Sequence, residues 1–223
     1  MDVDDFVSRY PVLFHMAEAG AWPSIQRCGL LSTSALLDLF EVGAARRLAI
    51  ESERRAQIEE LESAVYGRAV IRDNKPLREK FLLKCLDGMS PREWYELLNR
   101  KVFFWLDVQR LEKLLQARAY RNRAHDVLTV DTRSLLYSHL NDITLCPINS
   151  GATLYPSAPA RGRQTFKSIE EYDFPSMLRW RGKRNAIVEL TVAYKVSDIE
   201  RVTLRVDRRS RDQASELIWQ RYD

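Results

Sequence analysis

Residues 13–32 read LFHMAEAGAWPSIQRCGLLS, and this stretch decides the fold. The apolar residues 12–14 follow a proline and predict a short strand that ends at His15. Residues 17–28 have the apolar spacing of a helix, and Gly29 stands where a helix C-cap takes a left-handed backbone conformation. The stretch therefore predicts a strand, a histidine at its end, and a helix that closes on a glycine.

Outward from this stretch, the composition changes from helical to strand-like. Residues 44–65 carry an apolar stripe opposite an Arg/Glu-rich face and predict one amphipathic helix. Ser90 is a predicted helix N-cap, because Pro91 and Glu93 follow it in the pattern of a first turn. Runs of β-branched and aromatic residues predict strands at 102–106, 126–130, 186–193 and 201–206.

The composition describes a folded chain without a metal or membrane signature. Of its 223 residues, 45% are apolar and 30% are charged, which is enough to build a core. No apolar run approaches the roughly 20 residues of a membrane span, and the acidic start MDVDDF lacks the apolar segment of a secretion signal. The cysteines and histidines have no metal-ligand spacing: Cys28, Cys85, Cys146, His15, His125 and His139. We therefore expect a cytoplasmic protein with reduced thiols, no metal and no membrane partner.

The opening stretch also carries a family resemblance. An apolar and an aromatic residue precede His15, the following helix contains Ser24 and Ile25, and Gly29 and Leu30 come after it. In this pattern the chain resembles the first motif of ADP-ribosyltransferase-like proteins. It is most similar to the DarT-type nucleic-acid ADP-ribosyltransferases and the RNA 2′-phosphotransferases, and it is identified as a member of a bacterial branch of them. The resemblance implies an α+β fold, in which one domain over residues 1–223 contains a split, mostly antiparallel sheet and a helical insertion at about 35–100.

The resemblance also implies NAD as a substrate and assigns roles to particular residues. The histidine of the first motif contacts the ribose and adenylate side of NAD, and this role falls on His15. The aromatic strand 102–106 matches the second motif, so Phe104 or Trp105 would stack on the nicotinamide. The last motif is a glutamate on a late strand, which Glu189 matches. Its carboxylate would stabilise the positive charge that develops on the ribose, as carboxylates do in glycosidases.

Purely structural interpretations of the same residues remain open. His15 could serve only to tie the strand to the helix, and the aromatic residues of 102–106 could be core. In the strand predicted at 186–193, Ile187, Glu189 and Thr191 share one face, which could simply be solvated. A cleft along that face is the alternative that would give Glu189 a chemical role.

Residues 146–185 are predicted to form a long irregular loop with an excess of positive charge. They hold seven basic and three acidic residues, and the resulting net charge of +4 equals that of the whole chain. Long irregular loops are usually functional or disordered, and the aromatic residues of this loop argue against disorder. A basic loop with aromatic residues suits phosphate and base contacts. A packed loop whose polar groups satisfy its own backbone is the bland alternative. We expect NAD contacts from Arg72, Asn149, Ser150 and Thr153, and acceptor contacts from Arg161, Arg163, Thr165, Arg181 and Lys183.

The expected function is transfer of ADP-ribose from NAD to a macromolecular acceptor, either a nucleic acid or a protein. The resemblance implies a toxin or phage-defence effector, with an antitoxin as partner. One alternative is NAD-dependent removal of an RNA 2′-phosphate, although no second histidine stands near His15 in the sequence. The other alternative is a non-enzymatic module on a degenerate fold that binds nucleic acid or protein.

Overall fold

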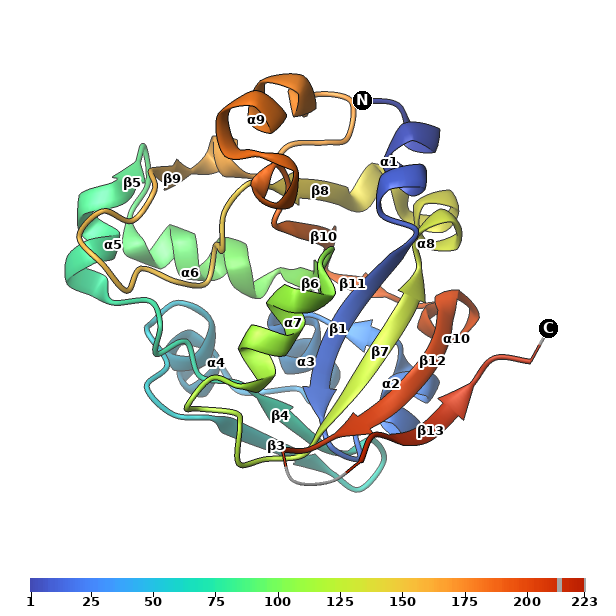
Figure 1. Cartoon of the computed structure of the whole chain (residues 1–223). Helices are drawn as coiled ribbons and strands as arrows, with labels where there is room; N and C mark the ends of the chain where they lie inside the picture. The colour runs from blue at the N-terminus through green and yellow to red at the C-terminus, as the bar shows by residue number, and fades with distance from the viewer. Residues whose placement is uncertain (212–213, 223) are drawn as a thin grey trace.

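The computed structural model describes residues 1–211 and 214–222, apart from the side chain of Lys183, and its centre is a seven-stranded sheet (Figure 1). The strand order is β13-β12-β7-β1-β6-β10-β8, and every neighbouring pair is antiparallel. The strands are β1 (Val12–Glu18), β6 (Lys101–Trp105), β7 (His125–Asp131), β8 (Ile143–Cys146), β10 (Glu189–Ala193), β12 (Thr203–Arg209) and β13 (Glu216–Gln220). The α+β class and the predominantly antiparallel sheet are therefore confirmed.

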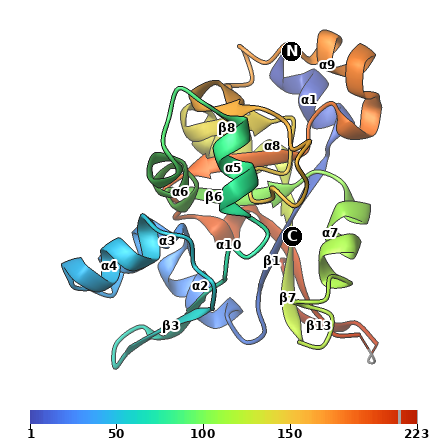
Figure 2. The same cartoon turned by 90° about the vertical axis from the view of Figure 1, so that its left-hand side faces the viewer.

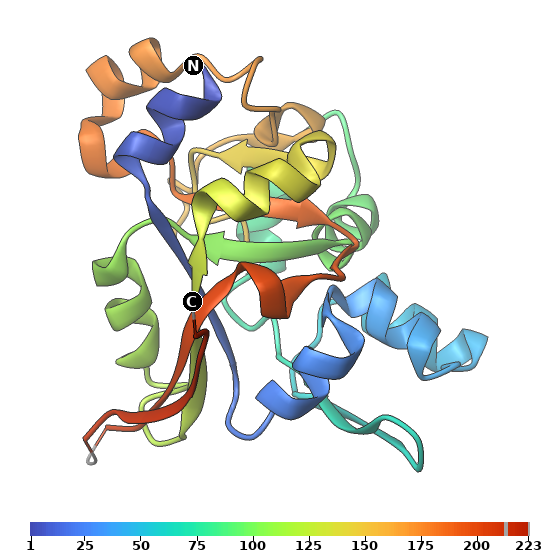
Figure 3. The same ribbon diagram turned by 90° about the vertical axis from the view of Figure 1, so that its right-hand side faces the viewer.

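The sheet has a seam between β1 and β6. β1 pairs with β7 along its whole length, but its register with β6 consists of a single pair, Phe14 opposite Trp105. Figure 3 shows the consequence: β1, β7 and β12 run steeply across the direction of β6, β10 and β8. The two halves of the sheet therefore share little backbone pairing where they meet.

Helices cover both faces of the sheet. One face packs Leu13, Phe104 and Leu128 into the largest core, and the other packs Met16 and Val127 against α7. The helices outside the insertion are α1 (Val3–Arg9), α2 (Trp22–Cys28), α7 (Val108–Leu115), α8 (Thr132–His139), α9 (Phe174–Arg181) and α10 (Ile199–Val202). A separate two-stranded sheet joins β2 (Leu30–Leu31) to β11 (Lys195–Val196).

β1 extends beyond the end predicted for the first strand, so His15 lies in the strand interior. The pairing with β7 continues to Glu18, and this ladder holds residues 16–18 extended where the sequence predicted the start of a helix. α2 begins only at Trp22, with Pro23 in its first turn, a position that tolerates the missing N–H of proline.

Gly29 ends α2 as predicted, with a φ of 86°. The position also excludes a side chain, because a Cβ atom there would lie 2.9 Å from the carbonyl oxygen of Val196. Both the left-handed backbone and the approach of β11 therefore require glycine.

The insertion is mixed rather than helical. Its elements are α3 (Thr33–Leu39), α4 (Ala44–Glu51), β3 (Glu59–Ser63), β4 (Gly67–Ile71), α5 (Glu79–Cys85), β5 (Leu86–Asp87) and α6 (Pro91–Asn99). The predicted start of α6 is confirmed, since Ser90 and Glu93 form a capping box. In Figure 2, α3, α4 and β3 project on the side of the molecule opposite α7.

The single helix predicted over 44–65 is wrong beyond Glu51. β3 instead pairs with β4 as an antiparallel hairpin, and Leu61 is buried between its exposed neighbours Glu60 and Glu62. This alternation has the period of a strand. Burial of one apolar side chain in a small core outweighs the helix propensity of the glutamates around it.

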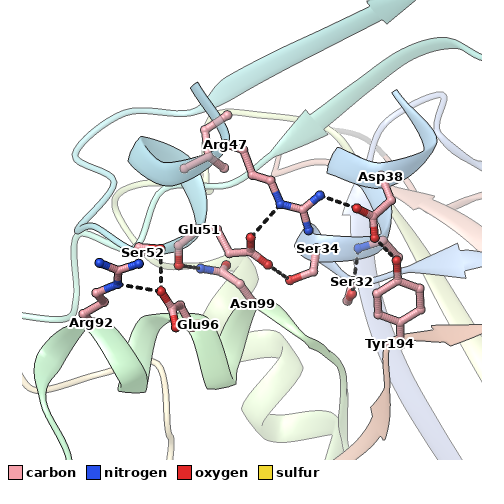
Figure 4. Close-up of polar contacts among 12 residues, drawn as sticks. Ser32, Ser34, Asp38, Arg47, Glu51, Ser52, Arg92, Glu96, Asn99 and Tyr194 are labelled. Carbon is pink, nitrogen blue, oxygen red and sulfur yellow. Dashed lines mark hydrogen bonds and ion pairs between the residues drawn. The ribbon is translucent and has the colours of Figure 1, made fainter. Parts of the chain in front are cut away.

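A polar network ties the insertion to the end of β10 (Figure 4). Arg47 of α4 donates to Asp38 of α3 and, at 2.9 Å, to Glu51. Ser34 donates to the other oxygen of Glu51, and the hydroxyl of Tyr194 donates to Asp38. Because Tyr194 directly follows β10, the network links the insertion to the strand that carries Glu189.

Residues 146–185 contain more regular structure than predicted. They include α9 and the short elements β9 (Arg161–Gly162), η2 (Arg163–Thr165) and η3 (Lys183–Asn185), while η1 (Leu140–Asp142) precedes β8. Asp173 caps α9 by accepting from the Ser176 N–H at 3.1 Å, so an aspartate within the predicted loop marks the start of a helix. In the part of the chain that the structure describes, no helix is long and apolar enough to cross a membrane.

Candidate functional site

A cavity of about 530 Å³ lies beside the seam of the sheet, and the insertion encloses its other side. The walls come from β1, β6 and β10, from α2, α3, β4 and α6, and from the turn after β8. Six of the predicted site residues line it: His15, Arg72, Trp105, Asn149, Ser150 and Glu189. The fold thus gathers residues from the beginning, middle and end of the chain around one space.

Glu189 is the first residue of β10 and is 4% exposed. Its register neighbours are Trp105 on β6 and Cys146 on β8. Ser150 donates three hydrogen bonds to the carboxylate, from its N–H at 3.2 and 3.3 Å and from its hydroxyl at 2.7 Å. Burial raises the pKa of Glu189 to about 7, although the Ser150 hydrogen bonds oppose the shift. The group therefore changes charge near neutral pH.

The solvated strand face that the sequence left open is ruled out. Ile187, Glu189 and Thr191 are all buried, with exposed fractions of 2%, 4% and 0%. Glu189 is therefore a buried carboxylate at a cavity wall, held by hydrogen-bond donors and not by bulk water.

His15 is partly buried on β1, and its Nδ1 lies 2.8 Å from the carbonyl oxygen of Phe103. Burial lowers the pKa of His15 to about 4, and the charge of Arg72 acts in the same direction. The ring is consequently neutral at pH 7. Because the carbonyl can only accept, Nδ1 carries the proton and Nε2 keeps a free lone pair in this tautomer.

Arg72 follows β4 and presents a guanidinium to the cavity. Its Nη2 donates to Nδ1 of His125 at 3.2 Å, and the guanidinium carbon lies 5.2 Å from the centre of the Tyr120 ring. Within residues 1–211 and 214–222, no carboxylate lies at ion-pair distance from it. Burial lowers its pKa. A desolvated guanidinium on neutral supports has unused capacity for an anion, and phosphate is the anion that such a fork binds best.

The aromatic wall differs in one residue from the expectation. Trp105 lines the cavity, but Phe104 is fully buried in the main core and does not reach it. Phe103 lines the cavity instead. Side chains alternate between the two faces of a strand, so Phe103 and Trp105 share one face and Phe104 points to the other.

The four expected acceptor residues whose side chains the structure describes are not among the residues that line the cavity. Arg161 is buried and 2% exposed, Arg163 forms a 2.9 Å ion pair with Glu93, and Thr165 accepts from the Gly162 N–H at 2.8 Å. Arg181 lies at the end of α9, 5.6 Å from the Trp180 ring. The side chain of Lys183 lies outside the described residues. None of these four residues therefore forms an exposed surface next to Glu189 that an acceptor could contact.

Thr153 is also not part of the cavity wall. Its side chain is buried and donates to the carbonyl oxygen of Arg78 at 3.1 Å. It therefore anchors the turn after β8 to the insertion, while Asn149 and Ser150 of the same turn face the cavity.

The two residues that contact the Arg72 guanidinium, His125 and Tyr120, were not predicted as site residues from the sequence. His125 begins β7 and its Nε2 lies 3.1 Å from the carbonyl oxygen of Tyr120. This contact fixes the proton on Nε2, so Nδ1 is free to accept from Arg72. The position of His125 at the start of an apolar strand could have marked it as a candidate. Nothing in the sequence indicates that it contacts Arg72, which is far away along the chain.

The described residues contain no cluster of three or more His, Cys, Asp or Glu side chains that could hold a metal ion. The model of a family of unknown function, DUF7002, matches residues 11–203. No curated protein and no solved structure matches the chain. The family match covers β1, β6, β7, β8 and β10 and every residue described above at the cavity. The chain therefore belongs to the DUF7002 family.

Proposed function

We propose that this protein transfers ADP-ribose from NAD to a macromolecular acceptor. The observation that carries the proposal is that His15, Arg72 and Glu189 line one cavity although they lie on β1, after β4 and on β10. The cavity volume falls within the range of about 300–1,000 Å³ that is typical of small-molecule sites. These residues supply one anion-binding group, one neutral hydrogen-bonding ring and one carboxylate.

Each group suits one part of NAD. The guanidinium of Arg72 suits the pyrophosphate, and the free lone pair of His15 suits a ribose hydroxyl. Trp105 offers an aromatic face to the nicotinamide, and it pairs in register with Glu189. The nicotinamide would therefore lie next to the carboxylate.

In the proposed reaction, the bond between the nicotinamide nitrogen and ribose C1′ breaks and its electron pair leaves with nicotinamide. Positive charge develops at C1′, and ionised Glu189 stabilises it electrostatically. An oxygen or nitrogen of the acceptor forms the new bond to C1′ and gives up its proton, for which ionised Glu189 is a base of suitable pKa. Only the ionised form of Glu189 performs both tasks.

The test is incubation with NAD that carries a radiolabel on the adenylate, together with mixed DNA, RNA and protein acceptors. We expect label on an acceptor and release of nicotinamide by the wild type, and neither with Glu189→Gln. Glu62→Gln makes the same chemical change at an exposed position on β3 and should keep the activity. Absence of nicotinamide release with every acceptor would contradict the proposal and favour a binding module.

One observation favours NAD-dependent removal of an RNA 2′-phosphate as a second candidate function. A second histidine, His125, lies against Arg72, although the two are far apart in the sequence. An RNA that carries an internal 2′-phosphate belongs among the acceptors for this reason. Loss of that phosphate from the RNA together with release of nicotinamide, with the phosphate recovered on ADP-ribose as a cyclic ester formed by a ribose hydroxyl, would identify the second function.

A further inference from the structure

Arg161 is a buried arginine behind the wall of the cavity that carries Glu189. Its Nη1 donates to the carbonyl oxygens of Ser150 at 3.1 Å and Ala152 at 3.0 Å, and its Nε donates to that of Pro159 at 3.2 Å. Its guanidinium carbon lies 5.9 Å from the Trp94 ring. No carboxylate of the described chain lies at ion-pair distance from it. An arginine that is 2% exposed and bound to three carbonyls cannot be a surface contact for an acceptor.

The turn that Arg161 holds is the turn that supports the Glu189 carboxylate. Ser150 accepts from Arg161 through its carbonyl and donates to Glu189 through its N–H and its hydroxyl. The two buried charges are thus joined through one residue. A positive charge behind a carboxylate in a poorly solvated region favours the ionised form, and it does so more strongly than it would in water.

The position of Arg161 is itself fixed by backbone packing. β9 pairs in parallel with β5, and Arg161 lies opposite Leu86. At the next residue, Gly162, a Cβ atom would lie 2.3 Å from the carbonyl oxygen of Asp87. Glycine therefore permits the close contact between the strands that places the Arg161 side chain beneath the Ser150 turn.

Three titratable groups act on Glu189 from the surrounding elements. Cys146 is adjacent on β8, and burial together with Glu189 raises the pKa of its thiol, so the thiol stays neutral. Arg161 acts from β9 and Arg110 from α7. Arg110 is partly exposed and donates to Asn185 at 2.5 Å, which directs it toward η3. Arg161 is the fully buried cation of this set.

We propose that Arg161 is a positioning residue for Glu189, which fixes the Ser150 turn and supplies a permanent positive charge behind the carboxylate. The kinetic consequence rests on the function proposed above, but the electrostatic one does not. Without Arg161, Glu189 would be protonated over a wider range of pH, and the donors from Ser150 would be less well placed.

The test is titration of Glu189 by ¹³C NMR of labelled glutamate carboxyls, with the resonance assigned by its loss in Glu189→Gln. Arg161→Gln keeps hydrogen-bond donors near Ser150 and removes the charge, so the Glu189 midpoint should rise by about one pH unit. Arg161→Lys keeps the charge but cannot span both carbonyls, so its midpoint should lie between those of the wild type and Arg161→Gln. Arg163→Gln, an exposed neighbour paired with Glu93, should leave the midpoint unchanged.

An unchanged midpoint in folded Arg161→Gln overturns the proposal. If Arg161→Gln does not fold, Arg161→Lys carries the test, and a wild-type midpoint in that variant overturns it. The titration separates this inference from the proposed function, because it needs neither NAD nor an acceptor. If transfer is found, its pH profile should move upward with the NMR midpoint in the same order of variants.

Discussion

Two groups of opposite charge, Glu189 and Arg72, line the cavity, and each charge is stabilised in a different way. Glu189 receives hydrogen bonds from Ser150, with the buried charge of Arg161 behind the turn. Arg72 instead rests on a neutral histidine and an aromatic ring. Burial raises the pKa of Glu189 to about 7, whereas a guanidinium stays charged at any ordinary pH. The charge of Glu189 therefore responds to pH and that of Arg72 does not.

The largest expected effect comes from replacing Glu189. Glu189→Gln should lower the rate of ADP-ribosyl transfer by about 10³-fold, because the amide cannot stabilise a positive ribose. In the wild type the rate should fall about tenfold per pH unit below pH 7, as the pKa of about 7 predicts for a group that must be ionised. A pH–rate profile that is flat between pH 5.5 and 7.5 would contradict this role.

The same carboxylate should make the protein less stable as the pH rises. Its pKa in the folded state, about 7, is above the ordinary value of 4.5, so folding favours the protonated form. This contribution is complete below about pH 4.5 and is lost as the pH rises through 7. Glu189→Gln resembles the protonated form, so its gain in melting temperature over the wild type should be larger at pH 8 than at pH 5. An equal gain at both pH values would show that the carboxyl titrates normally.

Replacing Arg72 should affect binding more than the chemical step. Arg72→Gln should raise the KM for NAD by about tenfold to a hundredfold, as expected for the loss of a charged hydrogen bond to phosphate, and should change kcat less. Arg46→Gln removes an exposed arginine of the insertion, paired with Glu59, and is the matched control. A fall in kcat at unchanged KM would place Arg72 with the reacting atoms instead.

His15 also lines the cavity, and a smaller effect is expected from changing it. His15→Asn can keep the hydrogen bond to the Phe103 carbonyl but loses the ring lone pair, so the KM for NAD should rise by up to about tenfold. Because the pKa of His15 is about 4, the wild-type profile should contain no inflection from it above pH 5.5. His139→Asn, which can still donate to Asp198, serves as the control.

The smallest effect should come from the polar network of the insertion, which lies outside the cavity wall. Asp38→Asn weakens the contacts with Arg47 and Tyr194, and the Asp38 and Arg47 side chains are 44% and 33% exposed. Exposed ion pairs contribute little, so the free energy of unfolding should change by less than about 1 kcal/mol. Transfer activity should stay within about twofold of the wild type. A larger loss of activity would mean that the insertion positions β10.

Elements with strong local signals could be predicted from the sequence. The strand 102–106 and the capping box at Ser90 follow from local residue preferences, and both are present. The prediction that Glu189 lines a cleft rested on one argument: a charged carboxylate is costly to bury in an apolar strand unless it has a partner or a function. Such features depend on a few neighbouring residues, which the sequence displays directly.

Features that depend on distant contacts could not be predicted. The hairpin of β3 and β4 forms because Leu61 packs into a small core with Leu37 and Ile71. Neither of these partners lies within 44–65, so that segment alone does not predict the hairpin. The face of the strand on which Phe104 lies depends on its register with β1 and β10. The positive charge of Arg161 looked like a surface feature in the sequence. The fold instead buries it beneath the turn that holds Glu189.

The single residue pair between β1 and β6 has a dynamic consequence. Most strand pairs of the central sheet resist bending through a ladder of hydrogen bonds, but at this seam mainly side-chain packing does so. The cavity lies beside the seam, so we expect small rotations of one half of the sheet against the other to change the width of the cavity. A ligand that contacts His15 on one half of the sheet and Glu189 on the other would link the two halves in place of the missing backbone hydrogen bonds. Its binding should slow amide hydrogen exchange along β1 and β6 more than in the outer strands β12 and β13.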